Sequence, residues 1–229
     1  MILAAGLGQR MGALTEARPK PMLPVGGRPI IDWVLDRLCA AGVERVVVNL
    51  HHEADLLRRH LQDRSSLHIQ FSDETDFLLD TGGGVAKALP MLGEAPFFVV
   101  NGDVLWFDAV RSSLRALATR FSTESMDALL LLQPTVSAVS YQGVGDYTML
   151  NDGQLRRRLE REVAPFIHSG IQILKPSLFK DYPDGPFSLN FIYDRAAQQK
   201  RLFGLRHEGQ WIELNHPEGL AAAEQALLE

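Results

Sequence analysis

The sequence predicts an α/β protein with a doubly wound, mostly parallel (mixed) sheet in a single domain that spans residues 1–229. Two observations support this prediction. Short apolar runs alternate with segments of helical periodicity through the first half of the chain, which is the order of a β-α-β protein. Some of these runs, such as the valines of residues 45–50, are apolar on both faces, as strands of a helix-covered parallel sheet are.

The first half divides into alternating strands and helices. Strands are expected at residues 1–5, 45–50, 68–71 and 97–101, and helices at 30–41, 54–61 and from three consecutive glycines to 92. The apolar residues of 30–41 recur at helical spacing, and Gly42 is the expected stop.

The second half is less regular. Helices are expected at residues 109–121, 189–199 and 217–228, and strands at 128–133, 141–150, 167–174, 202–206 and 211–214. Asn151-Asp152-Gly153 has the composition of a turn between two strands. The strands at 202–206 and 211–214 are expected to close the sheet.

Composition narrows the class of protein. The chain has 229 residues, of which 46% are hydrophobic and 22% charged, and its net charge is −5. This balance argues against a nucleic-acid groove. No apolar run is long enough for a membrane span, and we expect no signal peptide, although the first strand starts so abruptly that further residues before Met1 stay open. The single cysteine, Cys39, favours the reducing cytoplasm. A monomer and a homodimer both stay open.

The first strand leads into the glycine turn Gly6-Leu7-Gly8-Gln9-Arg10. Glycines allow positive φ and leave backbone N–H groups open to an anion. Arg10 and Lys20, the latter between two prolines, add positive charge, so a polyphosphate site is expected here. A dinucleotide fingerprint would need glycine where the chain has Met11, and the sequence lacks the Gly-Lys pair of a P-loop.

The segment L-A-A-G-L-G-Q-R-M, followed by P-K-P-M-L-P-V, resembles the signature of the sugar-1-phosphate nucleotidyltransferases. The resemblance implies a Rossmann-like nucleotidyltransferase fold, with a nucleotide-binding half at about 1–110 and a sugar-binding half at about 111–229. It implies catalytic roles for Arg10, Lys20 and Asp103. The implied nucleotide-binding residues of this loop are Leu3, Ala4, Ala5, Gly6, Leu7, Gly8, Gln9 and Arg10.

Three consecutive glycines follow Asp80-Thr81 and precede an expected helix. Their high conformational entropy makes a close backbone approach the favoured reason for them. The resemblance implies that Gly82 and Gly83 contact the nucleobase.

Asp103 follows the apolar strand 97–101, and a carboxylate there points into the ligand crevice of an α/β sheet. The resemblance makes Asp103 a ligand of Mg²⁺, an ion that prefers carboxylate and phosphate oxygens. Glu213 stands where the family has its second metal-binding aspartate, in W-I-E-L-N-H-P-E instead of W-x-D-x-G-T-P-E. One or two metal ions therefore stay open.

The resemblance also implies sugar contacts by Asn101, Gly145, Asp146, Gly170 and Asn190, although short glycine turns serve structure as often. A helix-start role is equally open for Asn190. Arg156-Arg157-Arg158 is interpreted as a solvated face, and His51-His52 as loop residues, because H-E-x-x-H fails at Leu56.

The expected reaction joins an NTP to a sugar-1-phosphate and releases pyrophosphate. By resemblance the leading pair is UTP with N-acetylmuramate-1-phosphate. Guanylyl transfer to mannose- or heptose-1-phosphate is the alternative, and cytidylyl transfer to a phospho-alcohol comes third. A nucleotide-binding regulatory module without turnover is the rival from another class, because Glu213, Asn215 and His216 depart from the family pattern.

Overall fold

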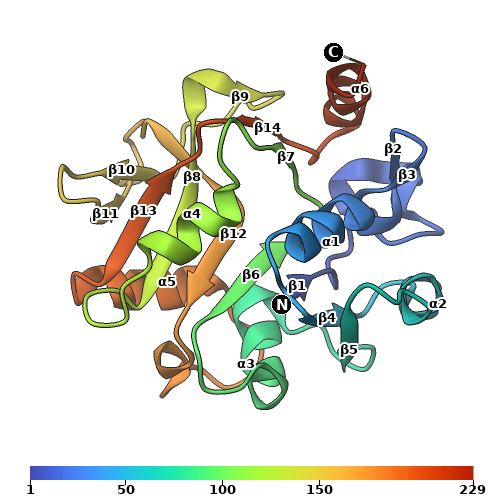
Figure 1. Cartoon of the computed structure of the whole chain (residues 1–229), viewed down its shortest axis with the longest axis horizontal. Helices are drawn as coiled ribbons and strands as arrows, with labels where there is room; N and C mark the ends of the chain where they lie inside the picture. The colour runs from blue at the N-terminus through green and yellow to red at the C-terminus, as the bar shows by residue number, and fades with distance from the viewer. Residues whose placement is uncertain (229) are drawn as a thin grey trace.

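The computed structural model describes residues 1–228, which contain a mixed nine-stranded sheet with helices on both faces (Figure 1). Its parallel part consists of β6 (Phe97–Asn101), β1 (Ile2–Leu3), β4 (Arg45–Leu50) and β5 (His68–Asp73), in that order. β12 (Phe166–Leu174) runs antiparallel to β6 and joins the second half of the chain to it. The remaining strands are β8 (Ala128–Pro134), β10 (Tyr147–Met149), β11 (Leu155–Arg157) and β13 (Leu202–Arg206). The expected fold class is confirmed.

The helices divide between the two faces of this sheet. α1 (Ile30–Ala40), α2 (Ala54–Gln62) and α4 (Ser113–Arg120) pack on one face, while α3 (Asp80–Leu92) and α5 (Leu189–Gln198) pack on the other. Successive residues of β4 serve both sides, since Val46 and Val48 belong to the first apolar cluster and Val47 to the second. A strand that is buried on both faces accounts for its unbroken run of valines.

The last expected strand does not close the main sheet, so this prediction is wrong. β14 (Gln210–Ile212) lies in a separate sheet between β7 (Leu105–Phe107) and β9 (Ala138–Val139). A third apolar cluster joins this small sheet to α6 (Pro217–Ala226) and to the hairpin of β2 (Pro24–Val25) and β3 (Arg28–Pro29). The C-terminal elements therefore lie beside the N-terminal loop, as Figure 1 shows for α6 and β2.

Several other boundaries differ from the sequence prediction. The strand expected at 141–150 is reduced to β10, because the chain turns at Gly145, whose φ is 75° and whose N–H donates to the Tyr141 hydroxyl. α4 begins at Ser113 instead of 109, since Ser112 is its N-cap. The first strand covers Ile2–Leu3 instead of residues 1–5. The other expected elements agree within a few residues at each end.

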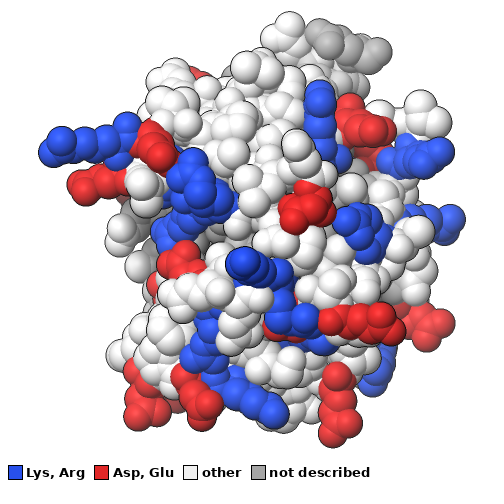
Figure 2. Space-filling model, turned by 90° about the vertical axis from the view of Figure 1, so that its left-hand side faces the viewer, with Lys and Arg blue, Asp and Glu red and all other residues white. Residues whose placement is uncertain are grey.

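Basic and acidic side chains are interspersed on the face of the molecule that Figure 2 shows. Arg156 pairs with Glu162 and Arg157 with Asp194, both at 2.7 Å. Arg156 and Arg157 therefore form an exposed face, as expected, whereas Arg158 is half-buried and donates to the Gly145 carbonyl at 2.8 Å. Within residues 1–228 no helix combines the length and the apolarity that crossing a membrane requires.

Candidate active site

A cavity of about 630 Å³ opens at the carboxyl ends of β1, β4 and β6. This is the position at which an open α/β sheet holds ligands. The structure brings together there most of the residues predicted to bind the nucleotide or to act in catalysis. Those that line the cavity are Leu3, Ala4, Ala5, Gly6, Leu7, Gly8, Gln9, Arg10, Lys20 and Asp103.

The loop after β1 forms one wall of the cavity and continues into a 3₁₀ helix, η1 (Gln9–Thr15). Gly8 has a φ of 66°, and a Cβ there would lie 2.9 Å from Thr15 Cγ2, so glycine is required. The Thr15 hydroxyl donates to the Gly8 carbonyl at 3.0 Å. Among residues 1–228 the N–H groups of Gly6, Leu7 and Gly8 donate to no protein acceptor, which leaves them for an anion.

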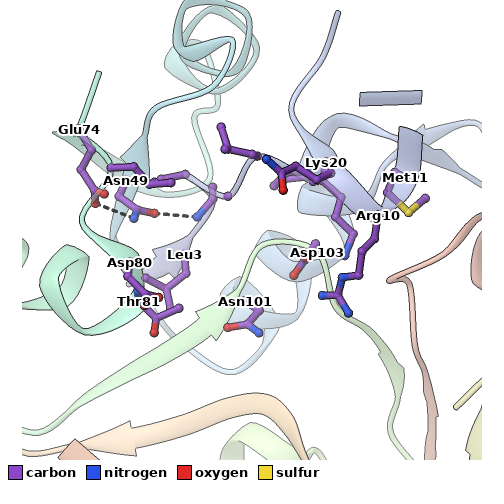
Figure 3. A pocket seen from close by; sticks show the side chains of 18 of the residues that line it. Leu3, Arg10, Met11, Lys20, Asn49, Glu74, Asp80, Thr81, Asn101 and Asp103 are labelled. Carbon is purple, nitrogen blue, oxygen red and sulfur yellow. Dashed lines mark hydrogen bonds and ion pairs between the residues drawn. The ribbon is translucent and has the colours of Figure 1, made fainter. Parts of the chain in front are cut away.

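Lys20 and Asp103 form an ion pair at one end of the cavity. Lys20 Nζ donates to Asp103 Oδ2 at 2.6 Å and to Asn215 Oδ1 at 2.8 Å. The side chain of Lys20 is only 8% exposed, whereas that of Asp103 is 30% exposed. Arg10 lies at the same end, next to Asp103 (Figure 3), and is exposed. Two partners and the 3₁₀ helix η2 (Lys20–Met22) hold Lys20 in place.

The opposite end of the cavity is lined by two polar residues that the sequence analysis missed. Asn49 Oδ1 accepts from the Ala4 N–H at 2.7 Å, and its Nδ2 donates to Glu74 Oε1 at 2.7 Å (Figure 3). Glu74 Oε2 accepts from the Leu79 N–H at 3.2 Å. A signal was present, since Asn49 interrupts an apolar strand and Glu74 follows the end of the next one. The pair holds the start of the glycine loop against β5.

The three glycines lie inside the first turns of α3, not in a turn before it. Gly82 and Gly83 are buried, and both N–H groups donate to the Phe187 carbonyl, at 2.8 and 3.1 Å. A Cβ on Gly82 would lie 2.4 Å from the Phe187 ring. Close approach does explain the glycines, but the approaching group is this chain's own Phe187. Asp80 and Thr81 line the cavity in their place.

The predicted sugar-binding residues separate into two groups. Asn101 lines the cavity, and Gly170, at a φ of 82°, packs directly on it. Asp146 Oδ2 accepts from the His168 N–H at 2.9 Å, so it supports β12. A Cβ on Gly145 would lie 2.1 Å from the Ala164 carbonyl oxygen, which gives this glycine a structural reason. Asn190 is exposed in the first turn of α5, where its N–H donates to the Ser188 hydroxyl at 3.2 Å.

Glu213 lies after β14 and does not line the cavity. Its Oε1 accepts from Asn215 Nδ2 at 2.9 Å. Within residues 1–228 no three His, Cys, Asp or Glu side chains cluster as they do in a metal site built from protein ligands alone. Asp103 is therefore the carboxylate at the lysine end of the cavity, and hydrogen bonds link Glu213 to it through Asn215 and Lys20.

The two histidines of the loop after β4 each hydrogen-bond a backbone carbonyl of another segment, in agreement with their interpretation as loop residues. His51 Nδ1 bonds the Glu74 carbonyl at 2.6 Å, and His52 Nε2 bonds the Thr15 carbonyl at 2.7 Å. A third histidine, His168 on β12, is enclosed in the protein, and burial lowers its pKa to about 4. His168 is thus neutral at pH 7 and supports structure instead of exchanging protons.

A glycine loop with unpaired N–H groups, a lysine and an aspartate, all at the carboxyl ends of parallel strands, are the features of a nucleotide-binding α/β enzyme. Residues 1–164 match the family model described as the MobA-like NTP transferase domain. The chain belongs to this family, and it is a nucleotidyltransferase.

Curated relatives and a solved structure agree with this assignment. The chain is 42% identical to N-acetylmuramate alpha-1-phosphate uridylyltransferase of Caulobacter vibrioides, over all of this chain and 96% of the relative. It is 36% identical to the enzyme of the same name from Neisseria meningitidis, over 93% of this chain and 91% of the relative. A putative glucose-1-phosphate thymidylyltransferase from Bacillus anthracis shares the fold, with a TM-score of 0.83 at 18% identity, over 98% of this chain and 93% of that one. The resemblance and the enzyme class expected from the sequence are confirmed, so the regulatory module without turnover is set aside.

Proposed function

We propose that this enzyme transfers a uridylyl group from UTP to N-acetylmuramate-1-phosphate, giving the UDP-sugar and pyrophosphate. The observation that carries the reaction class is the two-ended cavity: free backbone N–H groups, Lys20 and Arg10 lie at one end and the Asn49–Glu74 pair at the other. A nucleoside triphosphate has the same polarity, with a charged and a neutral end. The two uridylyltransferase relatives support the choice of UTP and of the acceptor.

The reaction needs no protein nucleophile. An oxygen of the sugar-1-phosphate attacks the α-phosphorus of UTP, a new P–O bond forms, and the bond to the β-phosphate breaks as pyrophosphate leaves. Positioning and charge stabilisation are sufficient for such a displacement. The N–H groups of residues 6–10 and Arg10 hold the β- and γ-phosphates, and Lys20 stabilises the charge that develops at the α-phosphate.

Family members typically depend on a divalent metal, and the donor groups of this chain fit Mg²⁺. Asp103 offers a carboxylate at the cavity mouth, of which only Oδ2 is paired with Lys20. Mg²⁺ is commonly bound by one or two carboxylates plus substrate phosphates, so a cluster of three is not required. Asp103 is the proposed ligand, and Glu213, which lies outside the cavity lining, is proposed as the second through Oε2, the oxygen that does not bond Asn215. The ion, when bound, neutralises phosphate charge.

The acceptor sugar is proposed to lie over β12, beside Asn101 and Gly170. Asn101 lines the cavity and Gly170, on β12, packs on Asn101, which supports this placement. Asp146 and Gly145 act there by shaping β12 and its neighbouring loop, and Asn190 lies at the edge of this half.

Pyrophosphate release is the direct test. UTP, GTP, CTP and dTTP are each assayed with Mg²⁺ and N-acetylmuramate-, glucose-, mannose- or heptose-1-phosphate. The highest kcat/KM is expected for UTP with N-acetylmuramate-1-phosphate. A higher value for GTP with mannose-1-phosphate would replace the proposed pair, and the absence of release with every pair would refute nucleotidyl transfer to sugar phosphates.

A further inference from the structure

Lys20 has a second partner that neither its own motif nor the comparisons assign. Asn215 Oδ1 accepts from Lys20 Nζ at 2.8 Å, while Asn215 Nδ2 donates to Glu213 Oε1 at 2.9 Å. The amide therefore has its oxygen toward the cation and its nitrogen toward the carboxylate. Only this orientation satisfies both partners, because an ammonium cannot accept a hydrogen bond and a carboxylate cannot donate one.

The surrounding structure fixes the place of Asn215. Leu214, its neighbour, is buried in the same apolar cluster as Met11 and Leu23 from the N-terminal loops. On the other side, α6 packs so closely that a Cβ on Gly219 would lie 1.9 Å from the Glu213 carbonyl oxygen. The segment 213–215 is thus held between the glycine loop and α6, and Asn215 has little freedom to leave Lys20.

The two acceptors of Lys20 differ in a way that matters for the reaction. Asp103 is charged and is also the proposed ligand of Mg²⁺, so Mg²⁺ and Lys20 compete for the same carboxylate. Asn215 is neutral and has no comparable attraction for the ion. A neutral acceptor therefore keeps its hydrogen bond to Lys20 when the Asp103 carboxylate binds Mg²⁺.

We propose that Asn215 is a positioning residue for Lys20, and that Glu213 orients it. Asn215 holds the ammonium toward the α-phosphate, and the hydrogen bond from Asn215 to Glu213 couples the Lys20 site to the proposed second metal ligand. This proposal rests on the proposed function in assigning Lys20 to catalysis. The loss of a residue that orients a functional side chain by a hydrogen bond typically changes activity or metal affinity about 10–100-fold.

The first test is a double-mutant cycle between Asn215 and Lys20, measured by pyrophosphate release with the best substrate pair. Asn215→Leu removes both hydrogen bonds at similar volume and is expected to lower kcat about 10–100-fold with little change in KM for UTP. In a Lys20→Met background the same change should alter kcat less than about 3-fold, because contacting residues are not additive. Equal effects in both backgrounds would overturn the proposal, since they indicate general damage to the fold.

The second test needs no turnover and so separates this proposal from the proposed function. Lysine acylation is followed by peptide mass spectrometry, with Lys200, an exposed residue at the end of α5, as the internal reference. Asn215→Leu should speed the labelling of Lys20 several-fold relative to Lys200. Asn151→Leu, in the exposed turn between β10 and β11, is the matched control and should leave the ratio unchanged.

Unchanged labelling of Lys20 in Asn215→Leu would refute the contact even if the enzyme were fully active. Faster labelling in a protein that releases no pyrophosphate would keep the contact and reject the proposed function. If the leucine variant does not fold, Asn215→Gly in the same two assays gives the same decision, because it removes the amide without adding an apolar side chain.

Discussion

Replacing Gly82 by alanine tests why this chain carries three consecutive glycines. The change is expected to destabilise the protein, although alanine favours a helix interior by about 1 kcal/mol. A Cβ at this position would lie 2.4 and 2.5 Å from two ring carbons of Phe187 and 2.8 Å from its carbonyl oxygen. The ring could turn aside, but the carbonyl is backbone that accepts from both Gly82 and Gly83.

The magnitude follows from these opposing effects. Overpacking a closed site costs typically 1–3 kcal/mol, at the upper end where backbone must move. After the gain in helix propensity, about 1–2 kcal/mol of destabilisation remains, which lowers Tm by roughly 2–8 °C in a chain of this size. Displacement of residues 185–188 also moves Pro186, which lines the cavity, so UTP should bind more weakly.

The assay is thermal unfolding together with calorimetric titration of UTP. Gly83→Ala is the matched comparison in the same helix turn, because its nearest contacts are looser, at 3.0 Å to Leu79 Cβ and 3.2 Å to the Gly185 carbonyl oxygen. Gly82→Ala should be the less stable of the two. A Gly82→Ala protein with raised Tm and unaltered UTP affinity would refute the packing argument. The prediction that these glycines contact the nucleobase would then be the better explanation for them.

Three further predictions concern charge. Lys20→Met should lower kcat about 10²–10³-fold, because one preorganised cation is lost. The same change should strengthen Mg²⁺ binding, because Lys20 no longer competes for Asp103. Weaker Mg²⁺ binding in a metal titration would contradict this prediction. Asp103→Asn should raise the Mg²⁺ concentration for half-maximal activity with little change in Tm, and superimposable titration curves would remove Asp103 from the metal site. His168 has its pKa lowered by burial from 6.5 to about 4, so the unfolded chain takes up a proton first as the pH falls. The contribution of His168 to the free energy of unfolding should therefore decrease by on the order of 3 kcal/mol between pH 6.5 and 4. His168→Phe should make the free energy of unfolding less dependent on pH in this range, as measured by denaturation at a series of pH values. An unchanged pH dependence would show that His168 is not the titrating group.

The sequence alone determined the class of fold and the charged end of the cavity. Apolar periodicity indicates how many faces of an element are buried, so the valines of β4 predicted a strand that is covered on both sides. Residues that follow parallel strands meet at one edge of a sheet, which is why Lys20 and Asp103 could be placed near the glycine loop before the fold was known. These inferences depend only on local pattern and on a general rule of topology.

Only the tertiary structure decided which groups complete the site. Asn215 bonds Lys20 across 195 residues, and the Phe187 carbonyl caps Gly82 and Gly83 from more than a hundred residues away. A pattern of apolar residues marks a position as buried but does not say what fills the space beside it. The partners of Lys20, Glu74 and the three glycines come from loops and from the small sheet of β14, and their positions depend on how distant segments pack together.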